Sequence, residues 1–330
     1  MLLKYQKTIS SGNQNSYKFA LGFAILDRYD GTSRLAFSRL SEIVAKLYYR
    51  NHVVFRLRET NNASQEPNAI KIIAKYLEQC GMAGQPPKQL SGYHLRELAK
   101  LLVEPPSGWG RSLFAYVLPC WQGASRDIRG YYVHPKQGAN EFFSYDVVKK
   151  EIALSDSFMT CINQHKMTLL SLSILEWAQF LEKFNISPNL ITKLRLKKPR
   201  RRLDKFRRIF CNLPELNLQN CFLCGRALGS DFTLDHVVPF DFVYSDDLWN
   251  LVPAHKECNS TKGSRVGSAS LLERLSVRNR SLYEAATNNQ PFLKPWISDQ
   301  FQSPAAMEER IQQLVRNGIA AGYPVDLVYR

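Results

Sequence analysis

Residues 221–262 read CFLCGRALGSDFTLDHVVPFDFVYSDDLWNLVPAHKECNSTK, and this stretch decides the fold around it. It opens with Cys221-x-x-Cys224 and ends near His255-x-x-Cys258, so two pairs of soft ligands flank a central segment. Four such ligands can bind one Zn²⁺ tetrahedrally, and the oxygen donors interleaved with them suit a second cation of another kind. The stretch therefore predicts a small module organised by metal ions.

The two cysteine-containing pairs predict a structural zinc site. Cys221 and Cys224 place two thiolates on one tight turn, and His255 and Cys258 supply the other two ligands from a helix or turn. A module of about fifty residues has too small a core to be rigid alone, so binding of Zn²⁺ is expected to stabilise its fold. Chance cysteine pairs in a reducing compartment are the alternative, and the coincidence of both pairs favours zinc.

A second site is predicted around Asp235 and His236. Both lie in Phe-Thr-Leu-Asp-His-Val-Val-Pro (232–239), an apolar and β-branched run that predicts a strand. Neighbouring strand residues point to opposite faces, so both side chains can serve one site only where the strand bends or ends, as at Pro239. Hydrolysis of a phosphodiester needs an activated water and a cation near the phosphoryl oxygens. An imidazole titrates near neutral pH, so His236 is suited to be the general base.

Three polar residues downstream complete this predicted catalytic site. The carboxylate of Asp235 and the side-chain carbonyl of Asn259 are hard donors, which favour Mg²⁺ or Mn²⁺ over zinc. Lys262 lies one helical turn beyond Asn259 and is expected to contact a phosphate, while the amide of Asn250 is expected to hold the loop that aims His236. Taken singly, each has a plainer alternative as a core histidine, a turn aspartate or a capping asparagine. Together their roles are mutually consistent.

In order and spacing these residues resemble the zinc-bearing HNH endonucleases, whose fold is a ββα-metal finger. The resemblance covers about residues 221–265, and the spacing of His236, Asn250 and Asn259 is similar to that in the HNH domain of CRISPR effector nucleases. It implies His236 as general base, Asp235 and Asn259 as ligands of one divalent cation, and Asn250 as the structural asparagine. Two positions depart from the family pattern. Asn259 replaces the last histidine, a common variant, and His255 stands where a zinc cysteine is more usual.

Positive charge is concentrated just upstream of the metal-binding stretch. The chain has 330 residues and a net charge of +15, and ten Lys or Arg stand against one Asp204 between residues 193 and 208. Neutralised phosphates release counterions, so this segment predicts a nucleic-acid-binding surface, with a solvated linker as the alternative. The predicted contacts are Lys193, Arg195, Lys197, Lys198, Arg200, Arg201, Arg202, Lys205, Arg207 and Arg208.

Apolar periodicity predicts the organisation of the remaining chain. It indicates two helices within 15–50, further helices over 68–79, 91–103, 167–184 and 199–210, and helices again after 267. Aromatic and β-branched residues over 110–147 indicate a few strands. The predicted fold is α+β: a mainly helical domain (1–190), a basic helix or linker (191–211), an HNH-like domain (212–267) and a C-terminal helical segment (268–330).

Composition restricts the class of protein. The hydrophobic fraction of 45% and the charged fraction of 22% are near those of folded, soluble proteins. We find no apolar run long enough to span a bilayer and no secretory signal, so we expect a cytoplasmic protein without a membrane partner. Seven cysteines, an odd number, disfavour a framework of disulfides.

These features together predict a metal-dependent DNA endonuclease in which the helical domain and the basic segment deliver duplex DNA to the HNH-like module. One ββα-metal site cuts one strand, so nicking is expected unless two sites act together. Analogy with the family suggests restriction or antiphage defence, with a homodimer or a defence-system protein as partner. The alternatives are a zinc-stabilised DNA-binding module without activity and an enzyme that cuts RNA or single strands.

Overall fold

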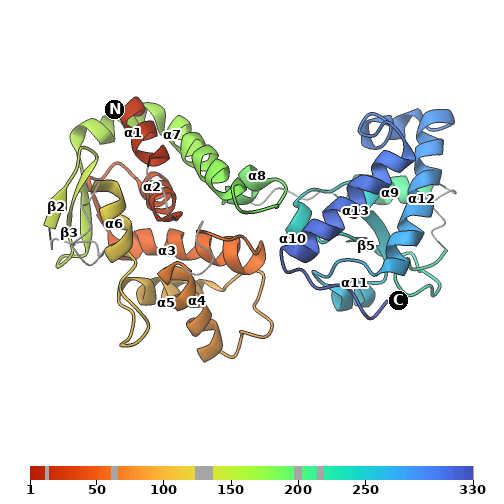
Figure 1. The fold of residues 1–330 in the computed structure, drawn as a ribbon, viewed down its shortest axis with the longest axis horizontal. Helices are drawn as coiled ribbons and strands as arrows, with labels where there is room; N and C mark the ends of the chain where they lie inside the picture. The colour runs from red at the N-terminus through yellow and green to blue at the C-terminus, as the bar shows by residue number, and fades with distance from the viewer. Residues whose placement is uncertain (12–14, 61–65, 123–136, 197–202, 214–218, 330) are drawn as a thin grey trace. The chain divides into compact units, whose positions relative to one another are not determined.

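A computed structural model describes the chain except for residues 12–14, 61–65, 123–136, 197–202, 214–218 and 330. The chain forms two compact units (Figure 1). The first unit comprises Met1–Asn185 and Leu190–Leu196, and the second comprises Ile186–Asn189 and Lys197–Arg330. Each unit buries its own set of apolar side chains.

The first unit packs helices around a small antiparallel sheet with strand order β1-β4-β3-β2. Its helices are α1 (Leu2–Ser10), α2 (Tyr17–Arg28), α3 (Phe37–Tyr48), the π-helical turn η1 (Tyr49–Val54), α4 (Asn68–Gln79), α5 (Gly92–Val103), α6 (Phe114–Gln122), α7 (Asp156–Glu182) and α8 (Leu190–Leu194). Its strands are β1 (Arg34–Ala36), β2 (Gln137–Ala139), β3 (Phe143–Asp146) and β4 (Glu151–Leu154).

Helix α2 lies at the centre of this unit. Its residues from Tyr17 to Leu26 are all buried, because α3, α6 and α7 pack around it. Close approach explains the glycine within this helix. A Cβ atom on Gly22 would lie 2.8 Å from the hydroxyl oxygen of Tyr5, so a larger residue there would displace α1.

Most predicted helices of the first unit are confirmed. The predictions over 68–79 and 91–103 correspond to α4 and α5, and the helix predicted over 167–184 is the later part of α7. A kink at His165, with a φ of −133°, divides α7, and the predicted helix corresponds to the segment after it, while Ser155 caps the segment before it.

The predicted strands over 110–147 are partly wrong. Strands β2 and β3 lie in this range, whereas Phe114–Gln122 is helical. Buried apolar side chains recur there at helical spacing, at Phe114, Val117, Leu118 and Trp121. Tyr131, Tyr132 and Val133, on which part of that prediction rested, lie outside the described part of the chain.

The second unit holds the metal-binding stretch within a helical frame. Its elements are α9 (Asp204–Asn212), β5 (Thr233–His236), α10 (Phe240–Val243), the 3₁₀ turn η3 (Leu248–Asn250), β6 (Leu251–Ala254), α11 (Lys256–Lys262), α12 (Ala269–Asn288), the 3₁₀ turn η4 (Pro291–Trp296) and α13 (Pro304–Ala320). Strands β5 and β6 pair antiparallel, with Asp235 opposite Val252 and His236 opposite Leu251. This hairpin followed by α11 gives the ββα order.

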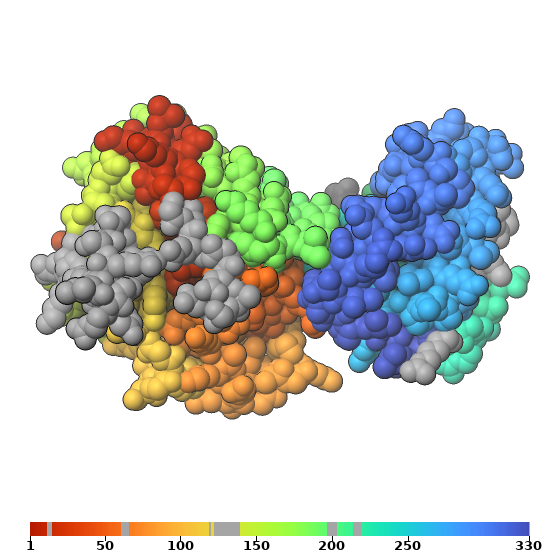
Figure 2. All heavy atoms as spheres, in the orientation of Figure 1, coloured from red at the N-terminus to blue at the C-terminus, as the bar shows by residue number. Residues whose placement is uncertain are grey.

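One hydrophobic core joins these elements. It includes Phe206 and Phe210 of α9, Val237 beyond β5, Leu282 of α12 and Leu314 of α13. In the space-filling view the C-terminal helices, in blue, extend over the visible face of this unit (Figure 2). Helix α9, the hairpin of β5 and β6 and the C-terminal helices therefore share their packing.

The α+β prediction is confirmed, since helices accompany two small antiparallel sheets. A search of the described helices finds none that combines the length and the apolar character needed to cross a bilayer.

Candidate metal centre and active site

The four predicted zinc ligands converge in the second unit. One ligand atom from each of Cys221, Cys224, His255 and Cys258 lies within 4.8 Å of all the others. The Nδ1 atom of His255 is 3.5 Å from the Cys224 sulfur, and its Nε2 atom is 2.9 Å from the carbonyl oxygen of Ala227. A proton on Nε2 donated to that carbonyl leaves the Nδ1 lone pair directed at the sulfurs, as metal-ligating histidines require. Three thiolates and one imidazole in this arrangement fit Zn²⁺.

A tight turn and a helix start position these ligands. The N–H group of Gly225 donates to the Cys221 carbonyl at 2.9 Å, and Gly225 has a φ of 73°, which glycine adopts at low cost. His255 is the N-cap residue of α11 and Cys258 lies in its first turn. The turn thus faces the beginning of α11. The turn supplies two sulfur ligands, and the start of the helix supplies one nitrogen and one sulfur.

The surroundings of the cluster promote the thiolate form of Cys224. Burial raises the pKa of Cys224, but hydrogen bonds from the backbone and side chain of Arg226, and from Cys221 and Cys258, lower it to about 6. Burial also raises the pKa of Cys258, and the Tyr329 hydroxyl opposes that shift. Because thiolates are the ligand form, these donors favour metal binding at neutral pH. Sequence reasoning did not identify Arg226 or Tyr329.

Asp235 lies at the end of β5 in a buried ion pair. The residue is 5% exposed, and its Oδ2 atom is 3.1 Å from the Nζ atom of Lys262. Burial raises the pKa of Asp235, while Lys262 and His236 oppose the shift. Lys262 is fully buried and also donates to the His236 carbonyl at 2.6 Å. Because α11 packs on β5, Lys262 lies beneath the surface and neutralises a buried carboxylate, and its predicted contact with a phosphate stays a prediction.

His236 is held by a carboxylate that sequence reasoning missed. Its Nε2 atom is 2.9 Å from Oδ1 of Asp246, and its ring meets that of Phe240 edge to face, with centroids 5.3 Å apart. Tyr244, with a left-handed φ of 52°, turns the chain so that Asp246 returns toward His236. Two adjacent acidic residues, 246 and 247, were the one sequence signal for this contact.

Asn250 fixes the chain just beyond His236. Its side-chain amide donates to the Val238 carbonyl at 2.9 Å and accepts from the Val238 N–H at 2.8 Å. Its own carbonyl accepts from the Val237 N–H at 3.0 Å. These bonds to both backbone groups of one residue agree with the expected role of Asn250, which is to hold the segment that carries His236.

Asn259 lies on α11 and contacts β5. Its Nδ2 atom donates to the Thr233 hydroxyl at 3.1 Å and to the Leu234 carbonyl at 3.3 Å. Different partners therefore hold the three residues of the expected active site. Lys262 and Asn259 of α11 contact β5 at Asp235 and at Thr233 and Leu234, whereas Asp246, which holds His236, lies in the loop after α10.

The basic segment is only partly within the described residues. Lys197, Lys198, Arg200, Arg201 and Arg202 lie outside them. Lys193 is fully buried in the first unit, with its Nζ atom 5.6 Å from the centroid of the Phe55 ring, so it cannot reach a phosphate in this structure.

The remaining four cations of this segment lie at or near the surface. Arg195, Lys205 and Arg208 are exposed, and Arg207 donates to the Ser230 carbonyl at 2.6 Å. Lys205 also lies 4.0 Å from the centroid of the Trp296 ring.

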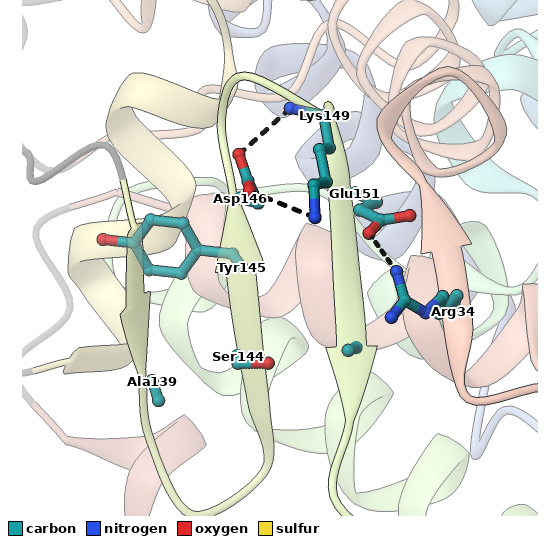
Figure 3. Close-up of a pocket in the computed structure, with 8 residues that line it drawn as sticks. Arg34, Ala139, Ser144, Tyr145, Asp146, Lys149 and Glu151 are labelled. Carbon is teal, nitrogen blue, oxygen red and sulfur yellow. Dashed lines mark hydrogen bonds and ion pairs between the residues drawn. The ribbon is translucent and has the colours of Figure 1, made fainter.

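A hollow on the sheet of the first unit shows no excess of positive charge (Figure 3). Its two basic side chains are each paired: Arg34 lies 2.6 Å from Glu151, and Lys149 lies 4.0 Å from Asp146. A phosphate site needs cations in excess, so this hollow is a poor candidate for the DNA-binding surface.

Residues 227–268 match the HNH endonuclease family. This range contains β5, β6 and α11 with Asp235, His236, Asn250 and Asn259, and also two of the four zinc ligands. The resemblance stated from the motif is confirmed, and the match indicates a nuclease module of the HNH kind. Neither the curated proteins nor the solved structures include a match to the chain.

Proposed function

We propose that this protein is a metal-dependent DNA endonuclease in which His236 is the general base. One observation carries the proposal. Within the residues that match HNH endonucleases, the buried imidazole of His236 is held by the Asp246 carboxylate at 2.9 Å. General-base catalysis uses an imidazole oriented in this way. Neither a zinc-stabilised scaffold nor a DNA-binding surface requires such a pair.

The proposed reaction is direct attack of water on phosphorus. His236 accepts a proton from the water, whose oxygen forms a bond to phosphorus while the bond to the leaving sugar oxygen breaks. The leaving oxygen then takes a proton from solvent, so no covalent enzyme intermediate forms. When Nε2 donates to Asp246, Nδ1 carries the lone pair and is the atom that accepts the proton.

Asp235 and Asn259 are the proposed ligands of one Mg²⁺ or Mn²⁺. Both offer hard oxygen donors and come from β5 and α11, which pack together. A cation bound there stabilises negative charge on the phosphoryl oxygens. We assign Lys262 a supporting role, because its ammonium group beside Asp235 favours the ionised carboxylate that a cation requires.

Duplex DNA is the proposed substrate, and a nick in one strand is the expected product of a single site. Exposed Arg195, Lys205 and Arg208 are proposed phosphate contacts. A role in restriction or antiphage defence, with a homodimer or another defence protein as partner, follows from family analogy.

The buried ion pair of Asp235 and Lys262 favours a second candidate function. If the carboxylate stays paired with Lys262, the second cation site does not form. The zinc-bearing unit would then bind DNA without cutting it.

Cleavage of supercoiled plasmid tests the proposal. We expect wild-type protein to nick the plasmid with Mg²⁺ or Mn²⁺ and not with EDTA. His236→Ala is expected to lower the rate by about 10²- to 10⁴-fold, the usual contribution of a general base. His165→Ala is the matched control. His165 is an exposed histidine of the first unit, so this variant should cleave at the wild-type rate.

Zinc content and circular dichroism, measured on each variant, show whether it is folded. Wild-type cleavage rates in His236→Ala would contradict the assignment of the base. DNA binding without cleavage by the wild-type protein, under any of these metal conditions, would favour the non-catalytic module.

A further inference from the structure

A pocket of about 570 Å³ lies beside the His236–Asp246 pair, within the second unit. Asp247, the neighbour of Asp246, lines it. Burial raises the pKa of Asp247, and a hydrogen bond from Ser245 and the charge of His236 oppose that shift. The imidazole therefore lies within electrostatic reach of a pocket wall. Its volume is within the range of pockets that hold small organic ligands.

The apolar part of the pocket is aromatic. Trp249 and Phe301 line it, with ring centroids 5.9 Å apart and planes at 90°. Trp249 is 5% exposed, and its Nε1 atom meets no hydrogen-bond acceptor among the described residues. That atom is itself shielded from solvent, so half-buried Phe301 supplies more of the aromatic surface that a ligand can reach.

The polar part of the pocket mixes donors and acceptors. Arg310, Gln300 and Asn189 bring exposed side chains to it, and Asp247 brings a carboxyl group. One cation is thus balanced by one acidic group. A phosphate site instead gathers several cations or N–H groups. Flat apolar walls with a few donors and acceptors suit a heterocyclic base, which stacks on its face and bonds along its edge.

We propose that this pocket takes one unpaired nucleobase of the strand that is cut at His236. The inference rests on the proposed nuclease function and adds a substrate contact to it. The base would stack against the aromatic walls, with Arg310 and Gln300 at its edge. A base in an intact stack cannot enter, so it must leave the duplex or come from a single-stranded segment.

A cycle of substrate and protein changes tests this contact. The cleavage position is first mapped on an oligonucleotide substrate. A series of oligonucleotides then carries a single abasic site, each at a different position on either side of the cleaved bond. Wild-type protein is expected to cut one of these about tenfold more slowly, as the loss of a stacked base predicts. The Arg310→Ala/Gln300→Ala variant should cut the intact substrate more slowly and show little further loss with the abasic one. Arg316→Ala, an exposed arginine on the same helix that does not line the pocket, should behave as wild type.

Two outcomes would overturn the pocket assignment. One is the absence of any position at which the missing base matters. The other is an equal abasic penalty in the wild type and the double variant at every position. In both cases cleavage itself persists, so the nuclease proposal survives. If the wild type cuts nothing, that proposal fails. Binding affinity measured without added Mg²⁺ or Mn²⁺, with the abasic site moved along the oligonucleotide, then still decides whether a base occupies the pocket.

Discussion

At the scale of single residues, burial decides what each charged group of the site contributes. Asp235 and Lys262 are both buried and lie 3.1 Å apart. Their attraction offsets the cost of removing two charges from water, and the loss of one partner leaves the other uncompensated. A substitution here therefore affects folding as well as chemistry, and the two effects must be measured separately.

Removing the cation of this pair is expected to destabilise the second unit. We predict that Lys262→Met lowers its free energy of unfolding by about 3–5 kcal/mol, because a buried carboxylate loses its partner. Asp235→Asn/Lys262→Met, which removes both charges, should recover part of this loss. Urea unfolding of the zinc-loaded protein measures both. Unfolding midpoints equal to that of the wild type would show that the pair is not buried as described.

Removing the carboxylate behind His236 is expected to impair turnover rather than binding. We predict that Asp246→Asn lowers kcat by about 10²-fold and leaves KM for plasmid near its wild-type value, because the imidazole loses its orientation. Asp299→Asn, which changes an exposed carboxylate of the same unit, should have no effect. A rise in KM at constant kcat would instead assign Asp246 to substrate binding.

These residues also show what sequence can and cannot predict about the site. Two short motifs bring four zinc ligands together, because a tight turn and one helix start suffice to aim them. The partners of His236 and Asp235 depend on the left-handed turn at Tyr244 and on the packing of α11 against β5. Local spacing carries no information on either, so Asp246 was missed and the burial of Lys262 was not foreseen.

At the scale of elements, the cluster of thiols and imidazole joins the turn before β5 to the start of α11. A small separate group of buried residues surrounds it, including Leu223, Ala254 and Leu271. So small an apolar group can contribute only modestly to the stability of this region, and the bound metal is expected to contribute the rest.

Loss of a zinc ligand is expected to release the metal and unfold this region, whereas loss of the proposed cation ligand Asp235 is expected to leave the zinc bound. We predict that Cys224→Ala and Cys258→Ala lose bound zinc and helical signal, while Asp235→Ala keeps its zinc. Metal analysis and circular dichroism of the purified variants provide the test. Equal loss of zinc in all three would mean that Asp235 belongs to the zinc site.

A glycine between α11 and α12 sets how closely the helices approach β5. A Cβ atom on Gly267 would lie 2.6 Å from a methyl carbon of Val237, the residue after His236. We predict that Gly267→Ala lowers the free energy of unfolding by about 1–3 kcal/mol through overpacking and also slows cleavage. Gly229→Ala is the control, since nothing lies within 4 Å of its added carbon. If Gly267→Ala and Gly229→Ala have the same unfolding temperature and the same rate of plasmid cleavage, the role assigned to Gly267 is wrong.

The elements differ in how well their sequences predict them. Helices α4 and α5 repeat apolar residues over several turns and could be predicted with close boundaries. Strands of three or four residues, such as β1 and β4, contain too little alternation to be recognised, and their pairing depends on segments far apart in the chain. The aromatic residues of α6 favoured a strand by composition, although their spacing was helical.

At the scale of the whole molecule, two units with separate cores are expected to respond to different conditions. The cysteine and histidine cluster belongs to the second unit, so chelation should affect that unit. The first unit contains Glu59, which is 1% exposed and accepts a hydrogen bond from the Trp177 indole at 3.2 Å. Its ionisation makes the first unit sensitive to pH.

Glu59 is expected to reduce the stability of the first unit as pH rises. Burial raises its pKa from 4.5 to about 7, despite the opposing effect of nearby donors such as the Trp177 indole. Between these values the folded state holds a proton that the unfolded state has released. The contribution of Glu59 to stability is therefore greatest below pH 4.5 and is lost as the pH rises to about 7. The loss amounts to about 3 kcal/mol. Glu59→Gln should remove this slope, and denaturant unfolding from pH 4 to 8 measures it. Parallel curves for the two proteins would contradict the assignment.

The core shared across the second unit limits how its nuclease motif can be transplanted. Side chains from Phe206 to Tyr323 meet in it, Val266 pairs with Val325, and the Ser268 hydroxyl donates to the Tyr329 carbonyl at 2.5 Å. A graft of the recognisable forty-odd residues alone would carry every group proposed for hydrolysis into a new host with its apolar underside bare. The portable piece is the motif together with the helices on either side of it.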